Sequence, residues 1–363
     1  MARLDFCLVH LSDFHLRTKT QPQTDHILSS LAVDLKERVE SLDLPAPHVA
    51  LSGDLAFGGR EEEYAIVDAF VGSMTEALHA KSTTFCGGNH DVNWGLLSPL
   101  STELMNGLTE KSDGLASVEA RFAVDADREA MRAGMGPYYS FLERHGVRSE
   151  PGLYYLRSLT VANLKLNLIS LNSAYLFSGN HFYHGYVGLQ QLRSAENAVT
   201  GRDPSFNITL VHHPLEAIAP ASQEETKRRL FAYSDIILNG HVHSPRVSVE
   251  YTARMLGRTR EGPPPIISCA RCVFDEENNP NIRAGYSIIG IDFEYETAAS
   301  VKVWEVEFDK ERNKWYYDER KQTYPMVVKV PKGSGEEMDR VGPKVTDEER
   351  KLLDRWKMER GPG

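Results

Sequence analysis

Residues 6–15 read FCLVHLSDFH, an apolar run of strand length that stops abruptly at a serine, an aspartate and a histidine. The same pattern returns in HVALSGD (48–54) and in STTFCGGNHD (82–91). Between these runs, residues 25–41 and 61–79 have the amphipathic spacing of helices, and the second opens with three glutamates, which favour a helix N-terminus. Short apolar strands that alternate with helices predict an α/β protein.

This rhythm breaks after the third run. Residues 93–160 form a long stretch with a helix predicted over about 125–145, and we interpret it as a helical insertion or cap over the site. A β-rich half with mostly short connections follows. Its predicted strands are LKLNLISLN (164–172), FNITLVHH (206–213), SDIILNGHVH (234–243), RVSVEY (246–251), PIISCA (265–270), YSIIGIDFE (286–294) and SVKVWEVEFD (300–309).

The composition shifts again near residue 330. PKGSGEEMDRVGPK reads as a polar linker, and TDEERKLLDRWKMER reads as a short amphipathic helix in which Thr346 and Glu349 make a capping box. We therefore predict a main domain over 1–330 and a linker with a helix over 331–363. That helix either docks on the domain or leads to a protein partner.

Charge and cysteine content bound the classes of function. The net charge of −10 argues against a surface that binds nucleic acid throughout, although it leaves room for a local basic groove. No charged-then-apolar leader and no apolar stretch of membrane-spanning length is apparent. The four cysteines are too few for a disulfide framework, and Cys7 and Cys86 lie in apolar runs where buried thiols are usual. We expect a cytoplasmic protein with no membrane contact.

Five polar clusters each follow an apolar run. They are SDFH (12–15), SGD (52–54), GGNHD (87–91), VHHP (211–214) and NGHVH (239–243). Because the carboxyl ends of strands gather at one edge of an open α/β sheet, residues just past those ends converge on one site. Asp13 with His15, and His241 with His243, are spaced i, i+2, which in an extended chain points both side chains the same way. Each pair is thereby predicted to bind a common metal centre.

The residue types in these clusters suit a pair of first-row divalent ions, and the absence of cysteine disfavours structural zinc. Two metals about 3.5 to 4 Å apart need a shared ligand, and the carboxylate of Asp54 has two oxygens for bridging. A water between the cations would lose a proton near neutral pH and attack phosphorus. His90 is the natural general acid for the leaving group, with Asp91 predicted to orient its ring.

In order and in content, the five clusters resemble the signature blocks of the calcineurin-like metallophosphoesterase family, and the match spans roughly residues 5–245. The resemblance implies a four-layer α/β/β/α sandwich of two mixed sheets flanked by helices. It also implies that Asp54 bridges two metals and that His90 lies over the leaving group. The first metal would be bound by Asp13, His15, Asp54 and His243, and the second by Asp54, Asn89, His212 and His241.

Other histidines have structural interpretations. We read His10 as a histidine at the edge of the core, and His213 as a support for the site rather than a further ligand. For His181 and His184, a polar loop is favoured over contact with substrate.

The remaining candidates are weaker. Cys269 and Cys272 form a single C-x-x-C, which we attribute to chance spacing. Arg60 is either a substrate contact or a residue at a helix start. A phosphate contact is open, but a solvated helix face is favoured, for Arg121, Arg128, Arg132, Arg144 and Arg148.

The leading hypothesis is metal-dependent hydrolysis of a phosphodiester in a nucleotide, a cyclic nucleotide or a nucleic acid. A large insertion over the site disfavours bulky protein substrates and favours a small phosphoester or nucleotide, or the end of a nucleic-acid strand. The alternatives are a phosphomonoesterase, such as a nucleotidase or protein phosphatase, an Mn²⁺-dependent DNA nuclease, and a catalytic module of a larger interaction protein. Two Mn²⁺ ions are the expected cofactors, with Fe²⁺ and Zn²⁺ also suited to the ligands.

Overall fold

The computed structural model describes most of the first 327 residues. The described ranges are 4–19, 22–110, 114–148, 154–200, 205–243, 246–249, 266–270, 273, 284–295, 298–317 and 322–327. The predicted linker and C-terminal helix, 331–363, lie outside these ranges, as does Cys272. The division of the chain near residue 330 therefore stays a prediction.

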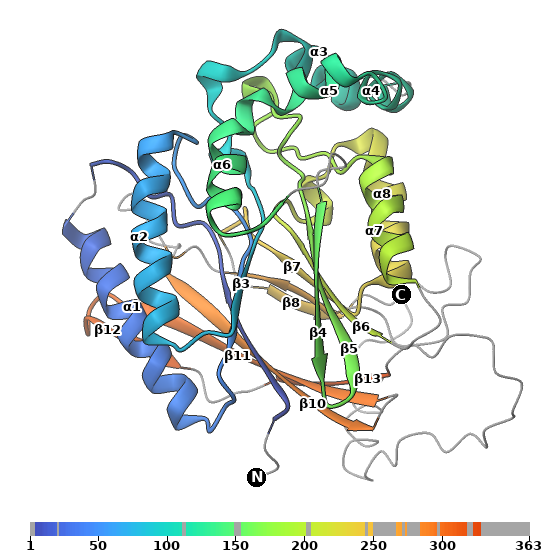
Figure 1. The fold of residues 1–363 in the computed structure, drawn as a ribbon. Coiled ribbons are helices and arrows are strands. Elements are labelled where there is room, and N and C mark those ends of the chain that lie inside the picture. The colour runs from blue at the N-terminus through green and yellow to red at the C-terminus, as the bar shows by residue number, and fades with distance from the viewer. Residues whose placement is uncertain are drawn as a thin grey trace, which may run out of the picture. The chain divides into compact units, whose positions relative to one another are not determined.

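One mixed sheet is built around the first strand of the chain (Figure 1). β1 pairs in parallel with β2, β2 pairs in parallel with β3, and β10 joins β1 from the other side in the antiparallel sense. The sheet order is β12 (Lys314–Tyr317), β11 (Ala298–Asp309), β10 (Gly285–Tyr295), β1 (Phe6–Leu11), β2 (His48–Leu51) and β3 (Ser82–Phe85), with β13 (Gln322–Val327) also paired to β11.

The second sheet comes from the later part of the chain. Its order is β4 (Tyr154–Val161), β5 (Leu164–Leu171), β6 (Ser205–Val211), β7 (Ile236–Asn239), β9 (Ile266–Cys269) and β8 (Arg246–Val249). β5, β6, β7 and β9 are parallel, whereas β4 and β8 are antiparallel to their neighbours. The strands predicted in the second half are therefore confirmed, and six of the described strands form this sheet.

Alternation of side chains along the strands produces four layers. In β1, Phe6 and Leu8 enter the core that the two sheets share, whereas Cys7 and Val9 belong to the core under the helices. The first sheet is covered by α1 (Pro22–Ser41) and α2 (Glu61–Ala77). The second is covered by α7 (Leu189–Val199) and α8 (Pro220–Tyr233). Two mixed sheets flanked by helices confirm the predicted α/β fold.

The segment between β3 and β5 differs from the prediction in two ways. It contains α3 (Pro99–Glu110), α4 (Gly114–Phe122), α5 (Asp125–Arg132) and α6 (Gly136–Arg144). The single helix predicted over 125–145 is thus two helices, which a 3-10 turn at Ala133–Met135 separates. β4 also falls inside the segment interpreted as an insertion. Its sequence, YYLRSLTV, has intermediate or exposed positions at most places, so its apolar alternation is weak.

The prediction of mostly short connections in the second half was wrong at two places, because α7 and α8 each lie between parallel strands. A crossover between neighbouring parallel strands needs a long connection, usually a helix. Among the described residues, no helix is both long enough and apolar enough to cross a bilayer. Cys7 and Cys86 are buried free thiols, as predicted, and burial raises the pKa of each to about 12.

Candidate metal centre

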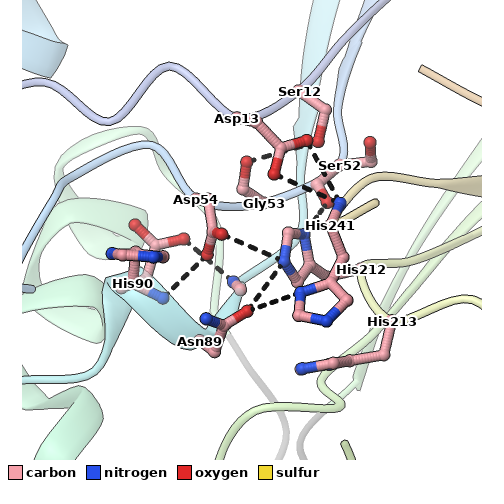
Figure 2. Close-up of polar contacts among 12 residues, drawn as sticks. Ser12, Asp13, Ser52, Gly53, Asp54, Asn89, His90, His212, His213 and His241 are labelled. Carbon is pink, nitrogen blue, oxygen red and sulfur yellow. Dashed lines mark hydrogen bonds and ion pairs between the residues drawn. The ribbon is translucent and has the colours of Figure 1, made fainter. Parts of the chain in front are cut away.

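The five polar clusters meet where the carboxyl ends of the central parallel strands of both sheets come together. Ser12–His15 follows β1, Ser52–Asp54 follows β2, and Gly87–Asp91 follows β3. His212 and His213 follow β6, and Gly240–His243 follows β7. Figure 2 shows side chains from both sheets pointing toward one another. All seven predicted ligands lie in this one site, namely Asp13, His15, Asp54, Asn89, His212, His241 and His243.

The backbone of these loops is left-handed at the site residues. The φ angle is 56° at Asp13, 48° at His15, 53° at Asp54, 71° at His241 and 54° at His243. The expectation of an extended chain was therefore wrong, and a common direction of side chains spaced i, i+2 does not apply. Non-glycine residues in this region cost on the order of 1–3 kcal/mol each, so the surrounding structure must hold them.

Hydrogen bonds between the loops provide that restraint. The amide of Asp13 donates to the carbonyl of Gly53 at 2.9 Å, and the amide of His15 donates to the carbonyl of Asp54 at 3.0 Å. The amide of His241 donates to both carboxylate oxygens of Asp13, at 3.1 and 3.2 Å. The loops after β1, β2 and β7 therefore restrain one another through hydrogen bonds within the protein alone.

One group of potential ligands consists of Asp13, His15 and His243. Nε2 of His243 lies 3.3 Å from Oδ1 of Asp13, and Nε2 of His15 lies 3.4 Å from Nε2 of His243. Burial alone would raise the pKa of Asp13, but its hydrogen bond with His243 and the nearby histidines lower it. Burial lowers the pKa of His15 to about 3. An ionised carboxylate, as at Asp13, beside a neutral imidazole, as at His15, is the kind of donor set that a divalent cation binds.

A second group consists of Asp54, His212 and His241, with Asn89 between the two rings. Oδ2 of Asp54 lies 3.2 Å from Nε2 of His212. Oδ1 of Asn89 lies 3.1 Å from Nε2 of His212 and 3.0 Å from Nδ1 of His241 (Figure 2). His241 and His243 therefore fall in different groups on the two sides of one centre, which is how the family resemblance divides them.

His212 is oriented from behind by the backbone. Its Nδ1 lies 2.8 Å from the carbonyl oxygen of Ser52, which accepts the ring proton and leaves Nε2 directed at Asp54 and Asn89. Burial disfavours the charged ring, but the carboxylate of Asp54 raises the pKa of His212 to about 9. In turn His212 holds the pKa of the buried Asp54 well below its usual range. In the absence of a cation, a proton on His212 compensates the charge of Asp54.

The residues present fit a pair of divalent cations. The side chains of Asp13 and Asp54 are buried, at 0% and 1% exposure, so their charges need partners inside the protein. Nε2 of His241 and Nδ2 of Asn89 are buried without a hydrogen-bond partner among the described residues. Asp54 belongs to the second group and also to a third, with His15 and His90, so its carboxylate lies between the two sides of the site.

His90 lies at the open side of this centre. Its amide donates to Oδ1 of Asp54 at 2.7 Å, and its Nδ1 lies 2.8 Å from the carbonyl oxygen of Phe57. The Nδ1 proton is donated to that carbonyl, so Nε2 is the ring atom that can exchange a proton with a bound molecule. The ring centroid lies 4.4 Å from that of His15.

Asp91 does not orient the ring of His90, contrary to the prediction. Its carboxylate accepts hydrogen bonds from the amides of Leu55, Ala56 and Gly88 and from the hydroxyl of Tyr64, at 2.9–3.3 Å. Burial and the charge of Asp54 raise the pKa of Asp91. Asp91 therefore ties the loop after β2 to the loop after β3, and the carbonyl of Phe57 orients the ring of His90 instead.

The histidines that the sequence assigned to structural roles have partners of that kind. Nε2 of His10 lies 2.9 Å from Oγ of Ser52, and His10 is fully buried rather than at the edge of the core. Nδ1 of His213 lies 2.8 Å from Oγ of Ser173, and its ring centroid lies 4.6 Å from that of His241. His213 thus packs behind a predicted ligand.

The arginines of the helical segment make local contacts. Arg144 forms ion pairs with Glu61 and Asp68, which join α6 to α2. Arg121 pairs with Asp127 and Arg128 pairs with Asp125, whereas Arg132 lies over the ring of Tyr139. Arg60 precedes the first residue of α2, and its amide donates to Glu63. The favoured structural interpretation of these arginines agrees with the contacts.

Aromatic residues around the site were missed. The rings of Phe57 and Phe182 lie 5.2 and 5.1 Å from that of His90, and the ring of Tyr183 lies 5.1 Å from that of His241. Trp94 lies 6.3 Å from Phe182. The segment GNHFYHGYVG contained a signal, because a polar loop has little reason to carry adjacent Phe and Tyr side chains.

No family model matches the chain, and no curated protein is similar to it in sequence. Among solved structures, a purple acid phosphatase from yellow lupin (Lupinus luteus) seeds is similar at a TM-score of 0.49 and 14% identity, over 88% of this chain. This chain spans about half (53%) of that protein. GAP50, the anchor in the inner membrane complex of Plasmodium, is similar at a TM-score of 0.45 and 11% identity, over 91% of each chain. At these values neither similarity indicates the function of this chain.

Proposed function

We propose that this protein is a dimetal phosphoesterase of the calcineurin-like metallophosphoesterase family, and that it hydrolyses phosphodiesters in preference to monoesters. One observation carries the proposal. Five loops from two sheets bring two carboxylates, an amide and four histidines together, with Asp54 within reach of groups on both sides. So many buried potential metal ligands that point toward one another, on loops with left-handed φ angles, indicate a functional site rather than a chance arrangement.

Each residue has a role in this proposal. Two cations bound there would lower the pKa of water to supply a nucleophile and would neutralise charge on the phosphoryl oxygens. One cation would be bound by Asp13, His15 and His243. The other would be bound by Asp54 and His212, and this second set of ligands is completed by Asn89 and His241.

His90 then supplies the proton that the departing alkoxide needs. Its Nδ1 is engaged by the carbonyl of Phe57, so the proton leaves from Nε2. The hydrogen bond between its amide and Asp54 ties the backbone of His90 to the residue that we propose is shared by the two cations. A residue held in this way supplies general acid catalysis without a large reorganisation.

The preference for diesters and for Mn²⁺ rests on separate observations. The helices α3 to α6 follow His90 in the chain, and we expect them, as the predicted cap, to make the site less suited to a bulky protein substrate. Mn²⁺ matches a mixture of carboxylate, amide and imidazole ligands. The buried thiols of Cys7 and Cys86 support the cytoplasm as the compartment.

A comparison of two chromogenic substrates tests this function. The metal-depleted full-length protein is reconstituted with Mn²⁺, Fe²⁺ or Zn²⁺ and assayed on bis-(p-nitrophenyl) phosphate and on p-nitrophenyl phosphate. We expect a higher kcat/KM for the diester with Mn²⁺. A rate confined to the monoester would make the protein a phosphomonoesterase, and no hydrolysis with any metal would overturn the proposed function.

A further inference from the structure

Four aromatic side chains are exposed at the edge of the metal centre, and we call them the aromatic rim. They are Phe57 at 39% exposure, Trp94 at 55%, Phe182 at 37% and Tyr183 at 51%. In the described part of the chain, Tyr316 on β12 is the remaining large aromatic residue that is exposed. Exposed aromatic rings that gather at one place, rather than scattering over the surface, mark a binding site.

The rim touches the residues that act on the substrate. Phe57 and Phe182 each contact the ring of His90, with ring centroids 5.2 and 5.1 Å apart from it. Trp94 extends this surface through Phe182 and through the buried Phe177, whose ring centroid lies 5.5 Å from that of Trp94. Phe57 and Phe182 therefore lie beside the group that we propose protonates the leaving alcohol, and Trp94 lies next to Phe182.

Tyr183 extends the rim to the other side of the centre, where its ring contacts His241. Arg17 lies over the ring of Phe57, with its guanidinium carbon 3.6 Å from the ring centroid. This contact restrains Phe57 and places a positive charge near the open side of the site. The flat apolar rings of the rim and the charged guanidinium of Arg17 therefore lie together, next to the position that we propose for the phosphate.

We propose that the aromatic rim stacks on a nucleobase, so that the substrates of this site are nucleotides rather than sugar phosphates or phosphoproteins. This inference rests on the proposed function, since it names the substrate class of the same metal centre. Stacking of a base on an aromatic side chain contributes roughly 1–3 kcal/mol, and it tolerates any base because each has a π face. The rim therefore selects for the presence of a base and not for its identity.

The test compares two ligands that differ in the base alone. Binding of adenosine 5′-monophosphate and of ribose 5-phosphate to the full-length, Mn²⁺-loaded protein is measured by calorimetry, with ³¹P NMR to verify that both stay intact. We expect the nucleotide to bind about 5- to 150-fold more tightly, as one stacked base implies. In the double variant Trp94→Leu, Phe182→Leu, the two affinities should become nearly equal.

Tyr316→Leu is the matched control, because it removes an exposed aromatic ring away from the site and should leave the ratio of affinities unchanged. Thermal unfolding checks that each variant is folded. Equal affinities in the wild-type protein, or an unchanged ratio in the double variant, would overturn the inference. Failure of the proposed function would be seen separately. The protein would then hydrolyse no ester, but the ratio of the two affinities could still be measured.

Discussion

The floor and the rim of the site are built in opposite ways. The floor, which comprises the carboxylates and histidines of the metal centre, is buried and tied to backbone groups, and several of its residues have left-handed φ angles. The rim is exposed, and its side chains contact the floor through their rings. The difference separates two tasks. The floor fixes the chemistry at phosphorus, whereas loop side chains such as those of the rim can change without disturbing the fold.

The largest effect is expected at the centre of the floor. Asp54→Asn removes the charge that both sides of the site share, so kcat on a phosphodiester should fall by about a thousandfold or more, equivalent to several kcal/mol of lost stabilisation. Steady-state kinetics and the metal content of the purified variant measure the change. Full activity with two bound metals would contradict the role of Asp54.

His90→Asn tests the boundary between floor and rim. General acid catalysis contributes about 10²- to 10⁴-fold, so kcat should fall by about a hundredfold for a diester with an alkyl leaving group. The loss should be much smaller for a p-nitrophenyl ester, because that phenolate leaves without a proton. Equal losses on the two substrates would assign His90 to metal binding or substrate binding instead.

Gly88→Ala tests whether the floor depends on close packing of its backbone. A Cβ at this position would overlap Oδ1 of Asp54 and lie 2.6 Å from the amide nitrogen of Asp54. We expect metal affinity to fall about 10- to 100-fold, as for the loss of a group that orients a ligand. Gly72→Ala is the control, since its Cβ meets nothing within 4 Å on α2 and should stabilise the protein by roughly 0.5–1 kcal/mol. Isothermal titration and thermal unfolding compare the two variants.

His48, at the start of β2, lies at the end of the strand opposite to the floor, and its effect is confined to acid pH. Burial, with the charges of Lys81 and Arg157, lowers the pKa of His48 from 6.5 to about 4. The unfolded chain therefore binds a proton as the pH falls through 6.5, whereas the folded protein does not until about pH 4. Stability is lost over that window, by up to about 1.4 kcal/mol per pH unit for one such histidine.

In the variant His48→Gln, the free energy of unfolding should depend less steeply on pH between pH 4 and 6.5. Between pH 7 and 8, the slope should be the same as in the wild-type protein. Denaturant titrations of the two proteins at several pH values measure it. Identical slopes between pH 4 and 6.5 would show that His48 does not contribute to the loss of stability in acid.

The sequence by itself determined where most of the strands lie along the chain and which residues gather at the site. Apolar runs that end in SDFH, SGD, GGNHD, VHHP and NGHVH are a local signal, because strand length and strand end are both visible in the pattern of residues. The amphipathic helices α1 and α2 were visible for the same reason. The helix break at Ala133–Met135 and the half-exposed strand β4 were not, since neither changes the apolar periodicity strongly.

Only the tertiary structure decided how the site residues are held. The left-handed backbone at Asp13 and His241 depends on hydrogen bonds between loops that are far apart in the chain. The orienting partner of His90 is a backbone carbonyl, at Phe57, and every residue has such a group, so the sequence carries no sign of it. Likewise, the rim exists because separate loops place Phe57 and Phe182 beside His90, and Trp94 beside Phe182. Contacts of this kind follow from the packing of two sheets, and no local pattern of residues encodes them.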